Sequence, residues 1–179
     1  MESEFVKPLA LTQSAVEAHP LKKKVIVGVF INKGKVLLAK KFNHQSLYLP
    51  GGTVEVTQDG LMQIQIEKMQ LAKFIFEKTQ CNIFPVRPIV EVCKNDGISI
   101  PIRAYLMTDK RIFTNSLFEE WKNNKQFQPI WLSQVKTNSH PYLPEAIKKI
   151  LTYFLANQEA FTEGPHYINL PIEVLTIAN

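Results

Sequence analysis

The sequence predicts a single α+β domain, in which short strands dominate and two longer helices complete the fold. Three observations lead to this expectation. Runs rich in Val and Ile recur between turn signals, a long stretch without Pro or Gly has apolar residues at helical spacing, and a second helical stretch lies near the C-terminus. The chain has 179 residues, enough for one domain, and its 45% hydrophobic and 21% charged residues are ordinary for a globular protein.

The first third of the chain is expected to form short extended segments. Residues 24–31 are rich in Val and Ile and read as a buried strand. Residues 32–34 form a turn, because Gly34 supplies the positive φ of a tight hairpin, and 35–41 follow as a second strand. Residues 47–52 run into a permissive Pro-Gly-Gly loop, and 53–56 are extended again.

The long helix is expected over 61–79, with Asp59 as its N-cap. A helical wheel divides it into an apolar side, expected to pack, and a polar side, expected to be solvated or paired. The apolar side carries Leu61, Met62, Met69, Ala72 and Phe76, widened by Ile64, Leu71 and Ile75. The polar side carries Gln63, Glu67, Gln70, Lys73, Glu77 and Lys78, with Phe74 in its middle.

The second half is expected to alternate strands with shorter helices. Residues 83–94 are extended, Asp96 and Gly97 form a hairpin turn, and alternating apolar residues over 98–106 mark a strand with one core face. The remaining elements are a short helix at 117–125, a strand at 127–132, a helix at 144–156 and an extended segment at 166–177.

Charge and hydropathy limit the partners and the compartment. The net charge of +5 favours anionic partners and does not exclude nucleic acid. The only tight cluster of basic residues is Lys22 to Lys24. We expect this cluster to be the solvated start of a strand or, alternatively, a contact with phosphate or RNA. The apolar run at 25–31 is too short to span a membrane, and the N-terminus has no secretory pattern. Two cysteines, Cys81 and Cys93, make no disulfide framework, so we expect a cytoplasmic protein.

The run LPGGTVE at 49–55 resembles the opening of the Nudix box, whose pattern is G, five residues, E, seven residues, R-E-U-x-E-E-x-G-U, where U is bulky and apolar. The hairpin at 24–41, the tryptophan strand near Trp131 and the helix from Pro144 resemble further elements of that family. The resemblance implies a Nudix-like α/β/α sandwich with a mixed central β-sheet over 22–156. An N-terminal arm at 1–21 precedes this domain, and a C-terminal extension at 157–179 is expected to pack on it.

The second half of the box fits residues 73–83 after an insertion of about two helical turns. In this register Gln58 takes the position of the loop Glu, Lys73 that of the Arg and Gln80 that of the Gly. The positions of the three helix acids are taken by Phe74, Glu77 and Lys78. A register without insertion, with Ile66 and Glu67 at the R-E position, remains the alternative.

The family's chemistry requires acids that this register lacks. Family members hydrolyse diphosphates linked to a nucleoside, using divalent metal ions that need several oxygen ligands. Of the three helix acids only Glu77 is present, and a lysine at position 78 opposes a dication electrostatically. No metal cofactor is therefore expected. If a metal does bind, Glu77 is the expected ligand. If the protein is active, Mg²⁺ or Mn²⁺ is the expected metal.

Three functions follow. The first is a Nudix-like protein, inactive or very weak, that binds a nucleotide, another phosphorylated small molecule or a protein partner. The second is an active Nudix hydrolase with relocated acids. The third is an interaction subunit whose terminal extensions form a homodimer or partner surface.

The candidate catalytic residues are Glu77 and Glu55, and the candidate ligand-binding residues are Gly51, Gly52, Lys73, Phe74, Lys78 and His44. For Phe74 we expect cover by a terminal extension or, alternatively, stacking on the ligand. For Lys73 and Lys78 we expect pairing with glutamates or, alternatively, contact with phosphate.

Overall fold

The computed structural model of the chain describes residues 22–32, 34–40, 45–80, 82–107, 125–136, 140–162 and 172–178. His44, the arm at 1–21 and all but the last residue of the expected helix at 117–125 lie outside these ranges, as does the first part of the expected segment at 166–177. None of the helices within these ranges is long and apolar enough to cross a membrane.

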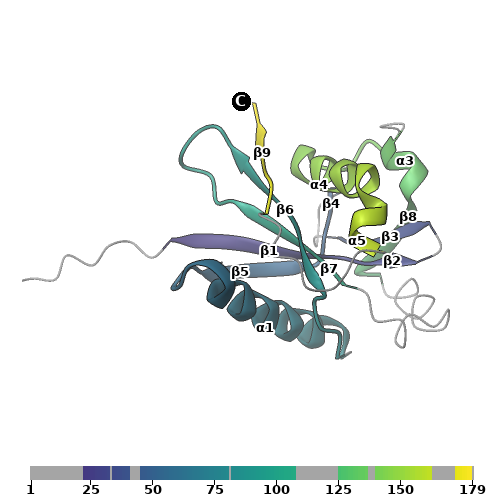
Figure 1. Ribbon diagram of the computed structural model, residues 1–179. Helices are drawn as coiled ribbons and strands as arrows, with labels where there is room; N and C mark the ends of the chain where they lie inside the picture. Colours follow the sequence, from purple (N-terminus) through teal and green to yellow (C-terminus); the bar gives the residue numbers. More distant parts are fainter. Residues whose placement is uncertain are drawn as a thin grey trace, which may run out of the picture.

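A five-stranded mixed sheet forms the centre of the fold (Figure 1). In spatial order its strands are β5 (Gly51–Glu55), β1 (Lys23–Val29), β7 (Ile102–Leu106), β6 (Arg87–Lys94) and β9 (Val174–Ile177). The pairs β1–β7 and β6–β9 are parallel, whereas β5–β1 and β7–β6 are antiparallel. Strand β5 lies at one edge, and β1 is its one strand neighbour among the described residues.

A second, smaller sheet is organised around β3 (Lys35–Lys40). Strand β3 pairs antiparallel with each of its partners, which are β2 (Ile31–Asn32), β4 (Leu47–Tyr48) and β8 (Phe127–Trp131). The expected turn before β3 has Gly34 at φ 76°, a left-handed conformation that glycine adopts at no steric cost.

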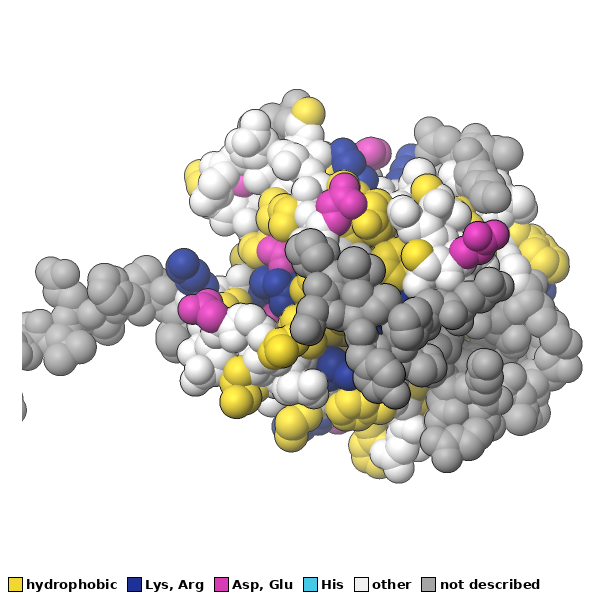
Figure 2. Space-filling view, viewed as in Figure 1, with side chains coloured by type: hydrophobic (Ala, Val, Ile, Leu, Met, Phe, Trp, Pro, Cys, Tyr) yellow, Lys and Arg dark blue, Asp and Glu magenta, His cyan; other side chains and the backbone are white. Residues whose placement is uncertain are grey.

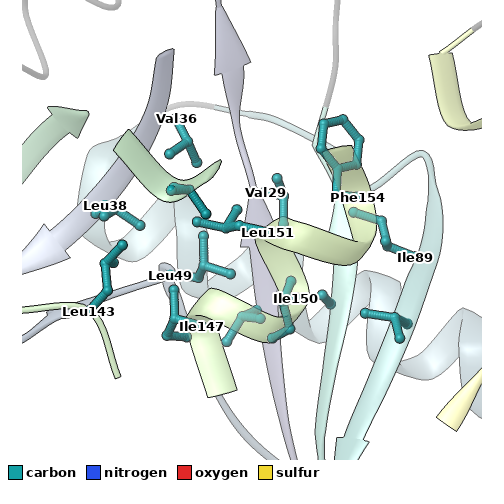
Figure 3. Close-up of a cluster of buried hydrophobic side chains, with 14 of the residues drawn as sticks. Val29, Val36, Leu38, Leu49, Ile89, Leu143, Ile147, Ile150, Leu151 and Phe154 are labelled. Carbon is teal, nitrogen blue, oxygen red and sulfur yellow. The ribbon is translucent and has the colours of Figure 1, made fainter. Parts of the chain in front are cut away.

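Helices cover both faces of the central sheet (Figure 1). Helix α1 (Gly60–Thr79) packs on one face, and α4 (Glu145–Ala156) packs on the other, with α3 (Leu132–Lys136) and α5 (Gln158–Thr162) against α4. Alternation along β1 divides the core. Ile26 joins the cluster under α1, whereas Val27 and Val29 join the cluster under α4, part of which Figure 3 shows. The predicted α/β/α sandwich with a mixed sheet is confirmed.

The predicted packing face of α1 was correct for Leu71 and Ile75 and wrong for most of its other members. The helix buries Gln63 and Glu67 together with two apolar residues, Leu71 and Ile75. The exposed side chains include Leu61, Met62, Met69 and Phe76, at 65, 61, 64 and 40% exposure. The reason is that the sheet supplies polar partners for Gln63 and Glu67, so burying them costs little, and a wheel that sorts residues by polarity alone cannot anticipate those partners.

The expected strand at 98–106 begins only at Ile102, and Ile98 is 89% exposed. The turn before it is wider than a tight hairpin, because the Asp96 carboxylate accepts hydrogen bonds from the backbone N–H groups of Ile98 and Ser99. These local bonds compete with sheet pairing and hold 96–99 as a loop.

The chain after α4 returns to the central sheet. In α5, Phe161 stacks on Phe154 with ring centroids 6.0 Å apart, and the Arg87 guanidinium lies 5.7 Å from the Phe161 ring centroid. Strand β9 then pairs with β6, with Glu91 opposite Val174. These contacts attach residues on both sides of 163–171 to the domain.

Candidate functional site

The Pro-Gly-Gly segment forms the start of the edge strand β5. The N–H of Gly28 donates to the Pro50 carbonyl at 2.7 Å, and Gly51 pairs with Val27. Neither Gly51 nor Gly52 has a positive φ, so the interpretation of a permissive turn was wrong about why glycine is required. A Cβ on Gly51 would lie 1.9 Å from the Ile26 carbonyl oxygen. Glycine is therefore required at position 51 because the backbones of β5 and β1 approach each other closely there.

Gly52 makes room for an aromatic ring. A Cβ on Gly52 would lie 2.6 Å from the Phe74 ring, which therefore packs directly on this glycine. Phe74 is half-buried and joins the hydrophobic cluster beneath α1. Strand β5 covers part of the ring, and Phe74 does not line the cavity described below. The cover expected from a terminal extension involves residues that lie largely outside the described ranges, so it stays a prediction.

Lys78 reaches from the last turn of α1 to the same segment. Its Nζ donates to the Gly51 carbonyl oxygen at 2.8 Å. Burial lowers the pKa of Lys78, and the neighbouring Glu77 charge opposes this by raising it. A cation at this position also interacts favourably with the negative end of the helix dipole. The side chain thus holds its amino group against the edge of the central sheet.

A cavity of about 440 Å³ opens beside this contact, between the two sheets. Gly51, Gly52 and Lys78 line it on one side. Its apolar lining includes Val25 and Val27 of β1, Ile102 of β7 and Ile147 of α4. Among the described residues, the polar side chains that line it are Lys40, Tyr48, Thr53 and Lys78. A largely apolar cavity with a few convergent polar groups is the usual form of a small-molecule site.

Neither of the two candidate catalytic acids lines this cavity. The Glu77 carboxylate pairs with Lys73 Nζ at 3.9 Å, and both side chains are more than half exposed. Glu55 is exposed on β5, and its backbone carbonyl accepts a hydrogen bond from Gln63. Among the described residues no group of three or more His, Cys, Asp or Glu could hold a metal ion. A lysine ammonium at Gly51 and separated carboxylates do not fit a dication.

Beneath α1 lies a buried charge network that the sequence did not reveal. Arg103 Nη1 lies 3.0 Å from the Glu67 carboxylate, and its Nη2 lies 2.7 Å from Glu91. Lys24 Nζ lies 2.8 Å from Glu91, and the Tyr105 hydroxyl donates to Glu67. Lys24 is only 8% exposed, so the reading of 22–24 as a solvated cluster was wrong for this residue.

The network perturbs its own titratable groups. Burial raises the pKa of Glu91, but hydrogen bonds and charges from Lys24 and Arg103 outweigh it and hold that pKa below its ordinary value. Burial and the bond to Glu67 raise the pKa of Tyr105. The sequence signal was a charged residue at 91 and at 103, each between apolar neighbours, and the sheet register places these two opposite each other.

Gln63 connects this network to the loop before α1. Its Oε1 accepts hydrogen bonds from the N–H groups of Thr57 and Gln58, at 3.2 and 3.1 Å. Its Nε2 donates to Glu67 at 3.2 Å. The loop that leaves β5 is thereby tied to buried charges, which stabilises the strand that carries the cavity's edge.

The end of α1 favours the register with an insertion. The helix stops at Thr79, and Gln80 has φ 58° and ψ 19°, a left-handed conformation that glycine adopts most easily. That register sets Gln80 at the glycine of the box. In the alternative register Glu67 takes the first acid position, yet Glu67 is fully buried and bonded within the protein.

Three of the eight candidate residues therefore meet at the cavity, namely Gly51, Gly52 and Lys78. Lys73, Phe74, Glu55 and Glu77 lie outside its lining, and His44 lies outside the described residues. Lys40, Tyr48 and Thr53 were missed. Tyr48 and Thr53 flank the Pro-Gly-Gly segment in the sequence, and proximity to it was the signal that could have indicated them.

No family model and no curated protein matches this sequence. Solved structures do match the fold. A Nudix hydrolase from Nitrosomonas europaea matches with a TM-score of 0.56 and 12% identity over 90% of this chain and 81% of that one. The E. coli ORF135 protein matches with a TM-score of 0.52 and 17% identity, over 79% and 95%. A mutT/nudix family protein from Listeria innocua matches with a TM-score of 0.50 and 15% identity, over 79% and 96%. The chain thus has the Nudix fold, as the box-like segment at 49–55 predicted.

Proposed function

We propose that this chain, a protein with the Nudix fold, binds a phosphorylated small molecule in the cavity beside Gly51 and does so without a divalent metal ion. The observation that carries the proposal is the Lys78 ammonium, held 2.8 Å from the Gly51 carbonyl oxygen at the cavity. An ammonium has three N–H donors, and the bond to Gly51 uses one of them. The other donors are available to a phosphate oxygen.

Electrostatics supports binding rather than metal-dependent hydrolysis. In the family a metal supplies the positive charge that holds the phosphates, and here Lys78 brings a positive charge to the same loop, with Lys40 as a second cation in the cavity lining. Lysine is an effective point-charge partner for phosphate. Of the candidate catalytic acids, Glu77 pairs with Lys73, and neither Glu77 nor Glu55 lines the cavity. A cytoplasmic location stays a prediction.

The test is phosphate binding in the presence of a chelator. We expect inorganic pyrophosphate and ADP to bind wild-type protein by calorimetry in EDTA, more weakly as salt rises and no more tightly when magnesium replaces EDTA. Lys78→Ala is expected to weaken this binding about tenfold or more, because a hydrogen bond to a charged group is worth about 1.5–3 kcal/mol.

The matched control is Lys73→Ala, which removes a lysine from the same helix outside the cavity lining. It is expected to bind pyrophosphate as the wild type does. Equal losses in both variants would show a general charge effect, and binding that requires magnesium would contradict the proposal.

The outer face of α1 favours a second candidate function, contact with another copy of the chain. Met62, Met69 and Phe76 are exposed and spaced by seven residues, so they lie along one line of the helix. Figure 2 shows hydrophobic side chains along the lower part of the molecule, where Figure 1 places α1. A two-fold antiparallel pairing centred on Met69 would set Met62 of each copy opposite Phe76 of the other, so the line is self-complementary.

This candidate predicts a dimer that Met69→Lys disrupts. We expect sedimentation equilibrium at micromolar concentration to detect a dimer of the wild type and a monomer of the variant, because a buried lysine without a partner is costly. Gln70→Lys adds the same charge to a neighbouring exposed position and is expected to leave the dimer intact. A monomeric wild type removes this function.

A further inference from the structure

The cavity has a polarity gradient that follows the sheet register. Thr53 of β5, Val25 of β1 and Ile102 of β7 lie directly beside one another across three adjacent strands. Residues opposite one another in a sheet point to the same face, so this row forms one wall of the cavity. The wall is polar at the β5 edge, where Lys78 lies, and aliphatic toward β7. The two ends are two strand spacings, about 10 Å, apart.

The aliphatic end is apolar on more than one side. Val27 of β1 and Ile147 of α4 line it together with Val25 and Ile102, and Val25 and Ile102 are only partly buried by the protein itself. This leaves apolar surface that a ligand can cover. Among the described residues, the side chains that line the cavity include no carboxylate and no amide.

A nucleobase and a hydrocarbon differ in what such a surface offers them. The ring nitrogens and exocyclic groups of a base need hydrogen-bond partners when they leave water, and burying them unpaired costs free energy. A hydrocarbon body has no such groups and gains free energy in proportion to the apolar area it covers.

We infer that the ligand is an organic phosphate or diphosphate with a compact hydrocarbon body, held by its anionic head at Lys78 and by its body over Val25, Val27 and Ile102. This inference rests on the proposed function, since it needs the same anion site. The head lies at the β5 edge, and the body extends across β1 toward β7. A cavity of about 440 Å³ accommodates a ligand of this small size.

The experiment compares ligands that share one head group. Inorganic pyrophosphate, a series of alkyl diphosphates of increasing chain length and ADP are titrated into the wild-type protein in EDTA. Each added methylene is expected to tighten binding up to about fourfold, the equivalent of about 0.8 kcal/mol, until the cavity is filled. ADP is expected to bind no more tightly than pyrophosphate.

A matched pair of variants locates the hydrocarbon body. Ile102→Thr keeps a β-branched side chain on the strand but makes the aliphatic end of the wall polar, and it is expected to reduce the gain per methylene without changing pyrophosphate binding. Ile98→Thr makes the same change at a residue that is exposed and outside the cavity, and it is expected to change neither. If Ile102→Thr does not fold, Val25→Thr tests the same wall from the neighbouring strand.

The outcomes separate this inference from the proposed function. Tighter binding of ADP than of any alkyl diphosphate, or no dependence on chain length, overturns the hydrocarbon body while the anion site at Lys78 stands. If affinity rises with chain length but neither Ile102→Thr nor Val25→Thr changes that rise, the hydrocarbon body lies elsewhere. That result also overturns the inference. If no diphosphate binds in EDTA, both proposals fall.

Discussion

Gly51→Ala is expected to destabilise the protein by roughly 3 kcal/mol or more, because the new methyl group meets backbone rather than side chain. The added Cβ would lie 1.9 Å from the Ile26 carbonyl oxygen and 2.8 Å from the Val27 Cα. Neither atom can move away without breaking the β1–β5 pairing at this point. Urea denaturation monitored by circular dichroism measures the loss in the free energy of unfolding.

Gly28→Ala is the matched control for this variant. Its Cβ would lie 2.7 Å from Met107 Cγ and 3.0 Å from the Phe30 ring, side-chain atoms that can shift more easily than the backbone atoms that Gly51 meets. A smaller loss, about 1 kcal/mol, is therefore expected. A Gly51→Ala protein as stable as the Gly28→Ala protein would mean that β5 does not approach β1 as closely as described, and the position of the Gly51 carbonyl at the cavity would then be in doubt.

Arg103→Met is expected to cost about 3–5 kcal/mol, because it leaves two buried carboxylates with one fewer cation. In the folded protein Arg103 contacts both Glu67 and Glu91, and Lys24 is their remaining basic partner within hydrogen-bonding or ion-pair range among the described residues. Methionine preserves much of the side-chain volume, so the loss reports charge rather than a cavity. Lys73→Ala, which breaks an exposed pair, is expected to cause no measurable change in the same denaturation experiment.

The pH dependence of the Arg103→Met loss identifies its cause. The folded-state pKa of Glu91 is held below its ordinary value of 4.5, so its contribution to stability is present above that pH and is lost as the pH falls through the folded-state pKa. Removing Arg103 takes away part of the interaction that lowers this pKa. The difference in unfolding free energy between wild type and variant should therefore shrink as the pH falls below about 4.5. A difference that stays constant down to acid pH would assign the loss to packing instead.

Local signals in the sequence determined the elements and the fold. The Val-rich run that became β1, the glycine turn before β3 and the helical spacing of α1 and α4 each depend on residues within one segment, where backbone preference and side-chain periodicity act directly. The box-like segment at 49–55, together with the order of the elements around it, indicated the family that the fold resembles. The absence of acids at positions 74 and 78 of the helix was also evident from the sequence alone. These features together predicted the Nudix fold and made a metal site unexpected.

Tertiary structure alone decided which face of α1 is buried and what the site contains. Glu67 is buried because Arg103 and Tyr105, 36 and 38 residues away, satisfy its carboxylate. Lys78 turns toward the cavity because the Gly51 carbonyl, 27 residues away, accepts its hydrogen bond at the open edge of the sheet. Polarity and periodicity describe a residue by its own chemistry, whereas the free energy of burying a charge depends on partners that only the folded chain brings within 3 Å or so.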